Sequence, residues 1–307
     1  MSAPTPSISQ PSLSTDKRLA PAQVGRLKQF NVDACADIHC HCLPGLDDGP
    51  ANWDASLELC QALVDDGVTH VVATPHQLGR YEHAHTAGDI TKRVEELRKR
   101  LTGQGIPLQL LVGADVRIAA ELPELLDSGG IHSIGGAKRY VLLELPHDQN
   151  LPTQPLLFEL ARRGCTGILT HPERNEALKR NPELILPWLE GGAVLQITSG
   201  SLIGEFGSRS QSLAWTWIRQ NLVHLVASDA HDTTRRRPRL TSAIKAFTAE
   251  GLPHIVTRRL CLENPLRVIR GEPLPKLRRR LSINPASPIV PNRKHGWLTR
   301  LFRRERA

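Results

Sequence analysis

The sequence DIHCHCLPGLDDG (residues 37–49) begins as an apolar run that carries two histidines and ends in a Gly- and Asp-rich turn. Side chains two residues apart on an extended strand point the same way, so His39 and His41 present two imidazoles on one face, and the neighbouring cysteines turn to the other. The Pro-Gly turn brings Asp47 and Asp48 back, and one of these carboxylates is expected to join the imidazoles. Nitrogen and oxygen donors in this mixture suit Mn²⁺, Fe²⁺ or Zn²⁺.

The same order of a short apolar run, a polar or Gly/Pro break and a helically spaced stretch recurs along the chain. Alternating strands and helices indicate a parallel sheet. Seven such units favour a single-domain α/β fold, a closed or nearly closed TIM-like (β/α)7 barrel, and an open doubly wound sheet is the alternative. The predicted strands are 36–41, 70–74, 108–114, 140–145, 167–170, 193–198 and 222–228, and the predicted helices are 55–66, 89–102, 122–127, 154–163, 182–190, 211–220 and 239–249.

Side chains that can bind metal follow six of these seven strands, and only the sixth, which ends near Thr198, offers no strong ligand. In a parallel barrel the carboxyl ends of the strands meet at one mouth, where active sites lie. Taken singly, each donor has an ordinary explanation, such as a helix cap for Asp115. Nine donors are too many for one ion with about six coordination positions, so two or three ions are predicted. The nine are His39, His41, Asp48, His76, Asp115, Glu144, His171, Asp229 and His231.

The net charge of +8 is concentrated at one end of the chain. Residues 276–307 carry ten Lys or Arg and one acid, whereas residues 1–275 carry 29 bases and 30 acids. The neutral body argues against a nucleic-acid partner. No apolar run approaches the roughly 20 residues of a membrane helix, and the N-terminus lacks the apolar core of a signal peptide, so a cytoplasmic location is expected. The six cysteines show no Cys-x-x-Cys spacing and are expected to be reduced and structural.

Composition divides the chain into three parts. Residues 1–32 are rich in Ser, Pro, Gln and Thr and are expected to form a disordered extension, residues 33–272 form the domain, and residues 273–307 form a basic tail. In the tail, Trp297, Leu298, Leu301 and Phe302 would share one face of a short helix. Two interpretations stay open: attachment to an anionic membrane surface or an acidic partner, and a solvated tail.

The segments DIHCHCLPGLDDG, VVATPH, GADVRI, LLELP, LTHPERN and LVASDAH resemble the PHP (polymerase and histidinol phosphatase) superfamily, and within it the CpsB/YwqE/CapC type of bacterial protein-tyrosine phosphatase of capsule and exopolysaccharide gene clusters. The resemblance runs from about Asp37 to Arg270. It implies a distorted (β/α)7 barrel with a trinuclear site held by the nine donors. That site is usually Mn²⁺-dependent, with Fe²⁺, Zn²⁺, Co²⁺ or Mg²⁺ as alternatives. Asp115 stands where this subfamily is expected to have Glu, so this carboxylate is one methylene shorter.

The resemblance also implies a substrate, a phosphotyrosine protein such as a membrane-anchored bacterial tyrosine kinase. Metal ions would neutralise the phosphate oxygens and supply hydroxide by lowering the pKa of bound water. Guanidinium groups would hold the charge on the equatorial oxygens, and Arg174 and Arg236 match arginines that the family places around the phosphate. With Asp48, they are the candidate catalytic residues. Arg236 lies in the run 235–237, which is also typical of a solvated charge run, so the choice among its three arginines stays open.

A different phosphatase chemistry uses Cys-x₅-Arg, and the span from Cys261 to Arg267 fits that spacing. Such a loop binds phosphate through consecutive backbone N–H groups, and Pro265 removes one of them. We therefore interpret the spacing as coincidence and expect residues 263–265 to cap a terminal helix. Two other functions are also compatible with these sequence motifs. One is a phosphoesterase for a small phosphomonoester such as histidinol phosphate, or for a nucleic-acid end, and the other is a non-catalytic scaffold that docks through its tail.

Overall fold

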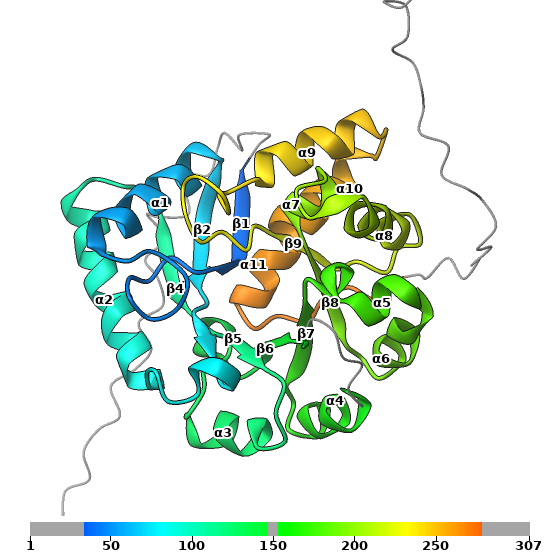
Figure 1. Cartoon of the computed structure of the whole chain (residues 1–307), viewed down its shortest axis with the longest axis horizontal. Coiled ribbons are helices and arrows are strands. Elements are labelled where there is room, and N and C mark those ends of the chain that lie inside the picture. The colour runs from blue at the N-terminus through cyan, green and yellow to red at the C-terminus, as the bar shows by residue number, and fades with distance from the viewer. Residues whose placement is uncertain (1–33, 147–152, 278–307) are drawn as a thin grey trace, which may run out of the picture.

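Parallel strands arranged in a ring form the centre of the computed structural model, which describes residues 34–146 and 153–277 (Figure 1). The predicted extension (1–32) and the predicted helical turn at 297–302 lie outside these residues. The strands are β1 (Cys35–Cys40), β2 (Val68–Ala73), β3 (His76–Gln77), β4 (Gln109–Val112), β5 (Asp115–Arg117), β6 (Tyr140–Glu144), β7 (Thr166–Thr170), β8 (Val194–Thr198) and β9 (Leu225–Ala227).

Two sheets, ordered β1-β2-β4 and β3-β5-β6-β7-β8-β9, make up this ring. β2 continues into β3 and β4 into β5, and the N–H of Asp115 donates to the carbonyl of Pro75 at 3.2 Å across the break. At the other junction the N–H of Asp229 donates to the carbonyl of His39 at 2.9 Å, which joins the end of β9 to β1. The predicted parallel α/β fold is therefore confirmed, in the TIM-like arrangement and not as an open doubly wound sheet, whose edge strands would not be bonded to each other.

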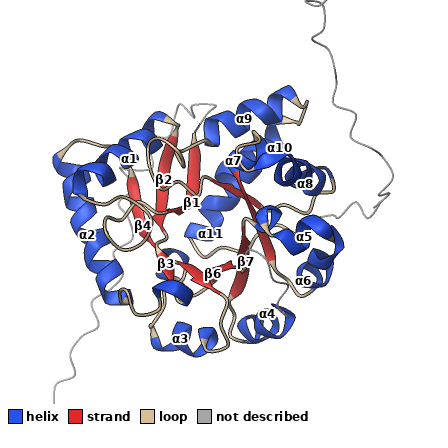
Figure 2. Ribbon diagram, viewed as in Figure 1, coloured by secondary structure: helices blue, strands red, loops and turns tan. Residues whose placement is uncertain are grey.

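Helices surround the strands (Figure 2). Side-chain caps fix where the first two begin: Asn52 accepts the N–H of Ala55, and Thr86 and Asp89 form a capping box. The helices are α1 (Trp53–Asp65), α2 (Ala87–Gly103), α3 (Leu122–Ser128), α4 (Thr153–Arg162), α5 (Glu176–Arg180), α6 (Leu186–Glu190), α7 (Ser199–Leu202), α8 (Gly207–Arg219), α9 (Leu240–Ala249), α10 (His254–Arg258) and α11 (Asn264–Ile269). No helix of the described ranges is long and apolar enough to cross a membrane.

One apolar cluster fills the inside of the ring, and a larger one lies between the strands and the helices. Leu142 of β6 and Val194 of β8 belong to the inner cluster. Side chains alternate along a strand, so Glu144 and Gln196, each two residues further on, face the inside of the ring as well. The carboxyl ends of the strands therefore carry buried polar groups above an apolar filling.

A bulge in β1 places the two histidines of the opening motif. Asp37 pairs with Val71 and Cys40 with Ala73, so β1 uses three steps where β2 uses two. As a result Ile38 belongs to the inner cluster and Cys40 to the outer one. His39 lies within this bulge and His41 follows it, and both are fully buried.

Two local predictions need correction. The predicted helix 182–190 is divided into a 3₁₀ turn (Pro182–Ile185) and α6. Residues 263–265 do not cap a helix, because Asn264 lies inside one helical segment that runs from α10 through a wider turn, 259–263, into α11. The Asn264 amide is instead used in tertiary packing, where it donates to the carbonyl of His224 at 2.7 Å.

Candidate metal centre

The nine predicted donors come together at the carboxyl ends of the strands. Their ligand atoms form four groups, in each of which all atoms lie within 4.8 Å of one another. His39, His41, His76 and Asp115 each belong to two groups, so neighbouring groups share side chains. The groups are His41, Asp48, His76 and His231; His39, His171 and Asp229; His39, His41 and Asp115; and His76, Asp115 and Glu144.

Backbone geometry at two of these residues is uncommon. His171 has φ 35° and Asp229 has φ 54°, the left-handed region that non-glycine residues rarely occupy. His171 directly follows β7, and Asp229 lies two residues after the end of β9. At both places the chain turns out of the ring. Strained backbone of this kind persists where the surroundings enforce it, and it clusters at functional sites.

Hydrogen bonds fix the tautomers of three of the histidines. Nδ1 of His39 lies 2.9 Å from Oε1 of Gln196, Nδ1 of His41 lies 2.7 Å from Oδ2 of Asp47, and Nδ1 of His231 lies 2.9 Å from the carbonyl of Asp229. Each partner is an acceptor, so each Nδ1 carries the proton and each Nε2 of a neutral ring presents a lone pair. Metal-binding histidines in proteins are oriented in this way.

These lone pairs face other acceptors. The Nε2 atoms of His39 and His41 lie 3.2 Å apart, and Oδ1 of Asp229 lies 3.3 Å from the first and 3.5 Å from the second. Within the described residues, Oδ1 of Asp229, Oδ2 of Asp115 and Nε2 of His231 are buried without a hydrogen-bond partner. Buried polar atoms are rarely left unpaired, because the desolvation cost is about 1–3 kcal/mol each. The residues present therefore fit divalent cations, whose positive charge would satisfy all of these atoms.

Burial keeps most of the imidazoles unprotonated. It lowers the pKa of His39 to about 3 and that of His76 to about 2, and it lowers the pKa of His171 well below its usual value. His41 is the exception: burial lowers its pKa, but the carboxylates of Asp47 and Asp229 outweigh burial and raise it to about 10. A proton and a cation would therefore compete most directly at His41.

The carboxyl groups are affected in opposite directions. Burial, with the neighbouring Glu144, raises the pKa of Asp115 well above its usual value. Burial acts the same way on Asp229, but Arg236, His39 and Arg174 outweigh it and hold the pKa of that carboxyl well below its usual value. Carboxyl groups this close together cannot all ionise unless a positive charge lies between them. Such crowding is typical of a cation site.

A pocket of about 230 Å³ opens above this cluster, and four arginines line it. Arg174 and Arg236 both donate to Oδ2 of Asp229, Arg236 at 2.6 Å. Of the three arginines at 235–237, Arg236 is the one that lines the pocket. The complete lining is Asp48, His76, Leu78, Arg80, Tyr81, Arg117, Glu144, His171, Arg174 and Arg236.

Sequence reasoning missed several residues of this site. Gln196, which holds His39, is a lone polar residue in the apolar run 194–197, and that contrast was the available signal. Asp47 was considered only as an alternative to Asp48, whereas the structure uses it to hold His41 and to accept the backbone N–H of His76 at 3.0 Å.

Two arginines of the pocket lining were also missed. Arg117 reaches Oε2 of Glu144 at 3.4 Å, and Arg80 lies over the ring of Tyr81, which stacks on His76 with centroids 5.3 Å apart. This rim depends on Gly79, whose φ is 59° and where an added Cβ would lie 3.0 Å from Cγ of Arg117. Nothing in the local sequence pattern marks that close approach.

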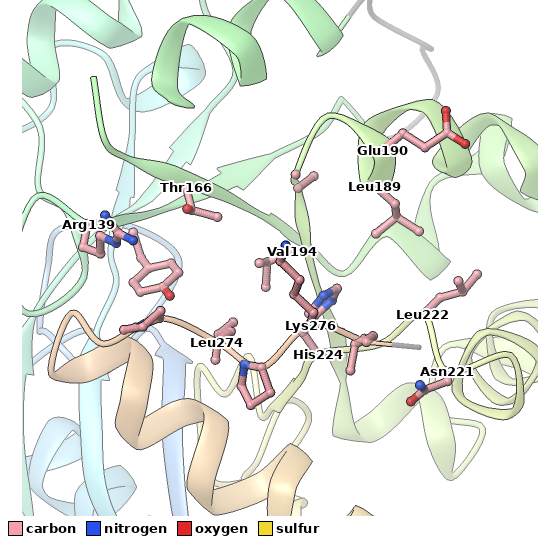
Figure 3. Close-up of a pocket in the computed structure, with 16 residues that line it drawn as sticks. Arg139, Thr166, Leu189, Glu190, Val194, Asn221, Leu222, His224, Leu274 and Lys276 are labelled. Carbon is pink, nitrogen blue, oxygen red and sulfur yellow. The ribbon is translucent and has the colours of Figure 1, made fainter. Parts of the chain in front are cut away.

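Two other features lie away from the cluster. A second pocket, of about 520 Å³, opens at the amino ends of the strands, where Thr166, Val194 and His224 line it (Figure 3). None of the nine donors lines this pocket. Cys261, of the Cys-x₅-Arg span, is buried, and burial raises the pKa of its thiol well above the usual value. It therefore lacks the accessible thiolate that a cysteine nucleophile requires.

The chain is similar to known proteins both in sequence and in fold. Residues 35–270 match a family model described as capsular polysaccharide synthesis, CpsB/CapC. The tyrosine-protein phosphatase YwqE of Bacillus subtilis is 37% identical over 254 residues, which are 80% of this chain and 98% of that protein. The tyrosine-protein phosphatase CpsB of Streptococcus pneumoniae is 26% identical over 244 residues, which are 77% of this chain and 98% of that protein.

The fold is also similar to that of a solved structure. It comes from work on YwqE from Bacillus subtilis and CpsB from Streptococcus pneumoniae, described as unique metal-dependent tyrosine phosphatases. It matches with a TM-score of 0.74 and 32% sequence identity, over 78% of this chain and 96% of that one. The similarity therefore extends over nearly the whole length of the relatives and over more than three quarters of this chain.

Proposed function

We propose, from the premise that the chain belongs to the CpsB/CapC family of capsular polysaccharide synthesis proteins, that it is a metal-dependent phosphatase of phosphotyrosine in proteins. The family that the sequence motifs indicate is thereby confirmed, and its relatives are named tyrosine-protein phosphatases. The observation that carries the proposal is the convergence of imidazole nitrogens and carboxylate oxygens below a pocket lined by arginines, where Oδ1 of Asp229, Oδ2 of Asp115 and Nε2 of His231 are buried without a hydrogen-bond partner among the described residues.

The metal ligands proposed are the nine side chains of the cluster, and two or three ions would share them. Imidazole with carboxylate suits Mn²⁺, our first choice, and also Fe²⁺, Zn²⁺ or Co²⁺, whereas Mg²⁺ prefers oxygen. When bound, such ions would neutralise the oxygens of a phosphomonoester and lower the pKa of a bound water. The shared residues His39, His41, His76 and Asp115 would hold adjacent ions close together.

Arg174 and Arg236 are proposed to hold the phosphate. A guanidinium group presents two parallel N–H groups to an oxyanion, a geometry that lysine cannot offer. Both arginines are pre-positioned, because both donate to Asp229 and the ring of Phe206 lies 4.3 Å from Cζ of Arg174. An arginine that is already ordered loses little conformational entropy when phosphate binds, so more of its interaction stabilises the transition state.

Asp48 is proposed to act at the mouth of the site. Its side chain is 39% exposed, the most open of the carboxylates in the cluster, and Oδ1 lies 3.4 Å from Nε2 of His231. Burial raises its pKa, but His231 and the other imidazoles outweigh burial and lower it. Asp48 is therefore an acceptor at neutral pH and would orient a water or bind an ion, and it would not donate a proton to the leaving phenolate.

The pocket walls suit an aryl ester. Leu78 and Tyr81 supply apolar and aromatic surface to the pocket, and four arginines supply positive charge. A phenyl ring can pack against the first while its phosphate reaches the second. The protein substrate would be a phosphotyrosine protein of capsule or exopolysaccharide synthesis, such as a membrane-anchored tyrosine kinase, which would place this enzyme in the cytoplasm at the inner face of the membrane.

Phosphate release tests the proposal. Protein stripped with EDTA and supplied with Mn²⁺ should hydrolyse a phosphotyrosine peptide, and the stripped protein without metal should not. Histidinol phosphate and a 3′-phosphorylated oligonucleotide serve as comparison substrates. Faster turnover of either comparison substrate, or hydrolysis that EDTA leaves unchanged, would contradict the proposed function.

A further inference from the structure

A groove of about 1060 Å³ lies on the outside of the barrel, lined mainly by α8, with Lys179 and Arg180 at the end of α5, Pro182, and Glu250 beyond α9 completing it. The helices α5 and α8 contact each other and lie side by side (Figure 1). The α8 wall includes Ser208, Ser212, Trp215 and Arg219, which are spaced four, three and four residues apart. That spacing puts them on one face of the helix. The groove therefore follows the length of α8.

The charge of this groove is positive. Its lining holds four bases, Lys179, Arg180, Arg209 and Arg219, against one acid, Glu250. Arg219 pairs with Glu250 at 2.7 Å, and Lys179 pairs with Glu176 of its own helix at 2.9 Å.

Two of these bases keep their charge available. Arg180 and Arg209 are exposed, and within the described parts of the chain neither lies within 4.0 Å of a carboxylate. Both guanidinium groups are near enough to Glu176 to help lower the pKa of that carboxyl. Two like charges that face one groove without direct counter-ions favour an anionic occupant.

Both helices that contribute to the groove start, along the chain, close to residues at the mouth of the candidate metal centre. α5 starts at Glu176, two residues after Arg174, and α8 starts at Gly207, directly after Phe206. The guanidinium group of Arg174 lies over the ring of Phe206. Both walls of the groove therefore lead away from the arginine that is proposed to hold the phosphate.

The length of the groove sets the reach of its ligand. From Ser208 to Arg219 the helix advances by roughly 17 Å, at 1.5 Å per residue. An extended peptide covers that distance with about five residues at 3.3 Å each. A peptide with phosphotyrosine in the pocket would therefore place the next few residues on one side along this groove.

We propose that the groove between α5 and α8 binds an acidic segment of the protein substrate adjacent to its phosphotyrosine. The proposal rests on the proposed function and adds to it a substrate class: phosphotyrosine followed or preceded by Asp or Glu. Arg180 and Arg209 recognise the carboxylates, and the peptide backbone packs along the α8 wall of the groove, beside Ser212 and Thr216. A small aryl phosphate fills the pocket alone and does not use the groove.

The experiment compares three phosphotyrosine peptides of equal length, with four Glu before the phosphotyrosine, with four Glu after it, or with Ser in their place. p-Nitrophenyl phosphate is the small substrate. At low salt the wild-type enzyme, loaded with Mn²⁺, should have a kcat/KM about fivefold higher for one acidic peptide than for the Ser peptide, the effect of two exposed ion pairs. The preference should fall as the salt concentration rises.

The double variant Arg180→Glu/Arg209→Glu should lose this preference and leave p-nitrophenyl phosphate hydrolysis unchanged. The control Lys92→Glu/Lys99→Glu makes the same change of net charge on α2, on the other side of the barrel (Figure 1), and should keep the preference. The proposal is overturned if the three peptides are hydrolysed equally well, if the double variant keeps the preference, or if both double variants lose it alike.

Failure of the proposed function gives a different result. In that case the metal-loaded wild type hydrolyses none of the phosphotyrosine substrates, and the groove is judged by binding alone. Fluorescence anisotropy of an unphosphorylated, labelled Glu peptide should then show binding to the wild type that Arg180→Glu/Arg209→Glu weakens about fivefold, again the effect of two exposed ion pairs. No binding to the wild type, or equal binding to the variant, overturns the docking groove itself.

Discussion

The Nε2 atoms of His39 and His41 lie 3.2 Å apart, and each ring donates its Nδ1–H to a fixed acceptor, Gln196 for His39 and Asp47 for His41. Two lone pairs at this distance repel each other unless a positive charge lies beside them. Gln196 and Asp47, which lie outside the set of nine donors, thus hold the two rings in this orientation. Only a cation or a proton between the rings removes the repulsion between their Nε2 lone pairs.

The first prediction concerns Asp47, which orients His41 and also accepts the backbone N–H of His76. Asp47→Asn should weaken metal affinity by about 10- to 100-fold, the usual effect of losing the group that orients a metal-binding histidine. Competition with a fluorescent chelator measures the affinity. Glu58→Gln, an exposed neutralisation on α1, is the matched control and should bind metal as the wild type does. Equal affinity of Asp47→Asn and wild type would show that His41 is oriented by something else.

The second prediction concerns the planar fork of Arg174. Arg174→Lys keeps the charge but cannot donate to two phosphate oxygens in parallel, so kcat should fall by about 100-fold, as for loss of one oxyanion donor. Steady-state kinetics on p-nitrophenyl phosphate measure the loss, and metal analysis checks that the ions remain. Arg235→Lys makes the same exchange outside the pocket lining. If Arg174→Lys has the same kcat as the Arg235→Lys control, Arg174 does not hold the phosphate in the transition state.

The third prediction separates metal from cysteine chemistry. Cys261 is buried in the outer apolar cluster, so Cys261→Ala should lower the free energy of unfolding by about 1 kcal/mol, as expected for a small cavity. Its activity per folded molecule should equal that of the wild type. Phosphatase assays with protein concentration corrected by circular dichroism provide the measurement. Complete loss of activity in a folded Cys261→Ala protein would restore the Cys-x₅-Arg interpretation.

The fourth prediction is a pH dependence of stability. Burial raises the pKa of Asp37 to about 7, whereas in the unfolded chain it stays near 3.8. Between these values the folded state binds more protons than the unfolded state, so the free energy of unfolding falls as pH rises through this window. Above it the total loss is on the order of a few kcal/mol, because one pKa unit corresponds to about 1.4 kcal/mol.

Asp37→Asn removes this titration, since an amide oxygen can still accept the N–H groups of His39 and Ser228. Urea unfolding in EDTA at pH 4.5 and 7.5 should show a smaller loss of stability on raising the pH in this variant than in the wild type. The exposed variant Asp54→Asn should behave as the wild type. An identical pH slope for Asp37→Asn and wild type would contradict the assignment.

The parts of the fold that follow from local pattern were predictable from sequence. The seven apolar runs become strand positions, because burial on both faces requires near-continuous apolar residues. The nine donors meet because parallel strands present their carboxyl ends together, a rule that needs no side-chain detail. Their roles as metal ligands, and those of Arg174 and Arg236, stay predictions, as does the division at residues 32 and 272.

The features that sequence did not predict depend on distant contacts. Gln196 meets His39 across 157 positions of the chain, and its pairing is decided by the order of strands around the ring. The bulge in β1 adds one residue to the strand. A prediction based on strict alternation of side chains along a strand cannot include it. Residues 263–265 were expected to cap a terminal helix, but the amide of Asn264 donates to the carbonyl of His224, a contact 40 positions away in the chain.

The central claim is that several cations bind to the nine donor side chains at the carboxyl ends of the strands and share some of them as ligands. Titration of Mn²⁺ into EDTA-stripped protein, followed by calorimetry and by elemental analysis after gel filtration, tests it directly. We predict two or three equivalents per chain, reduced in His39→Ala, whose imidazole belongs to two of the donor groups. Retention of no metal by the wild type, or the same stoichiometry in His39→Ala as in wild type, would contradict the account.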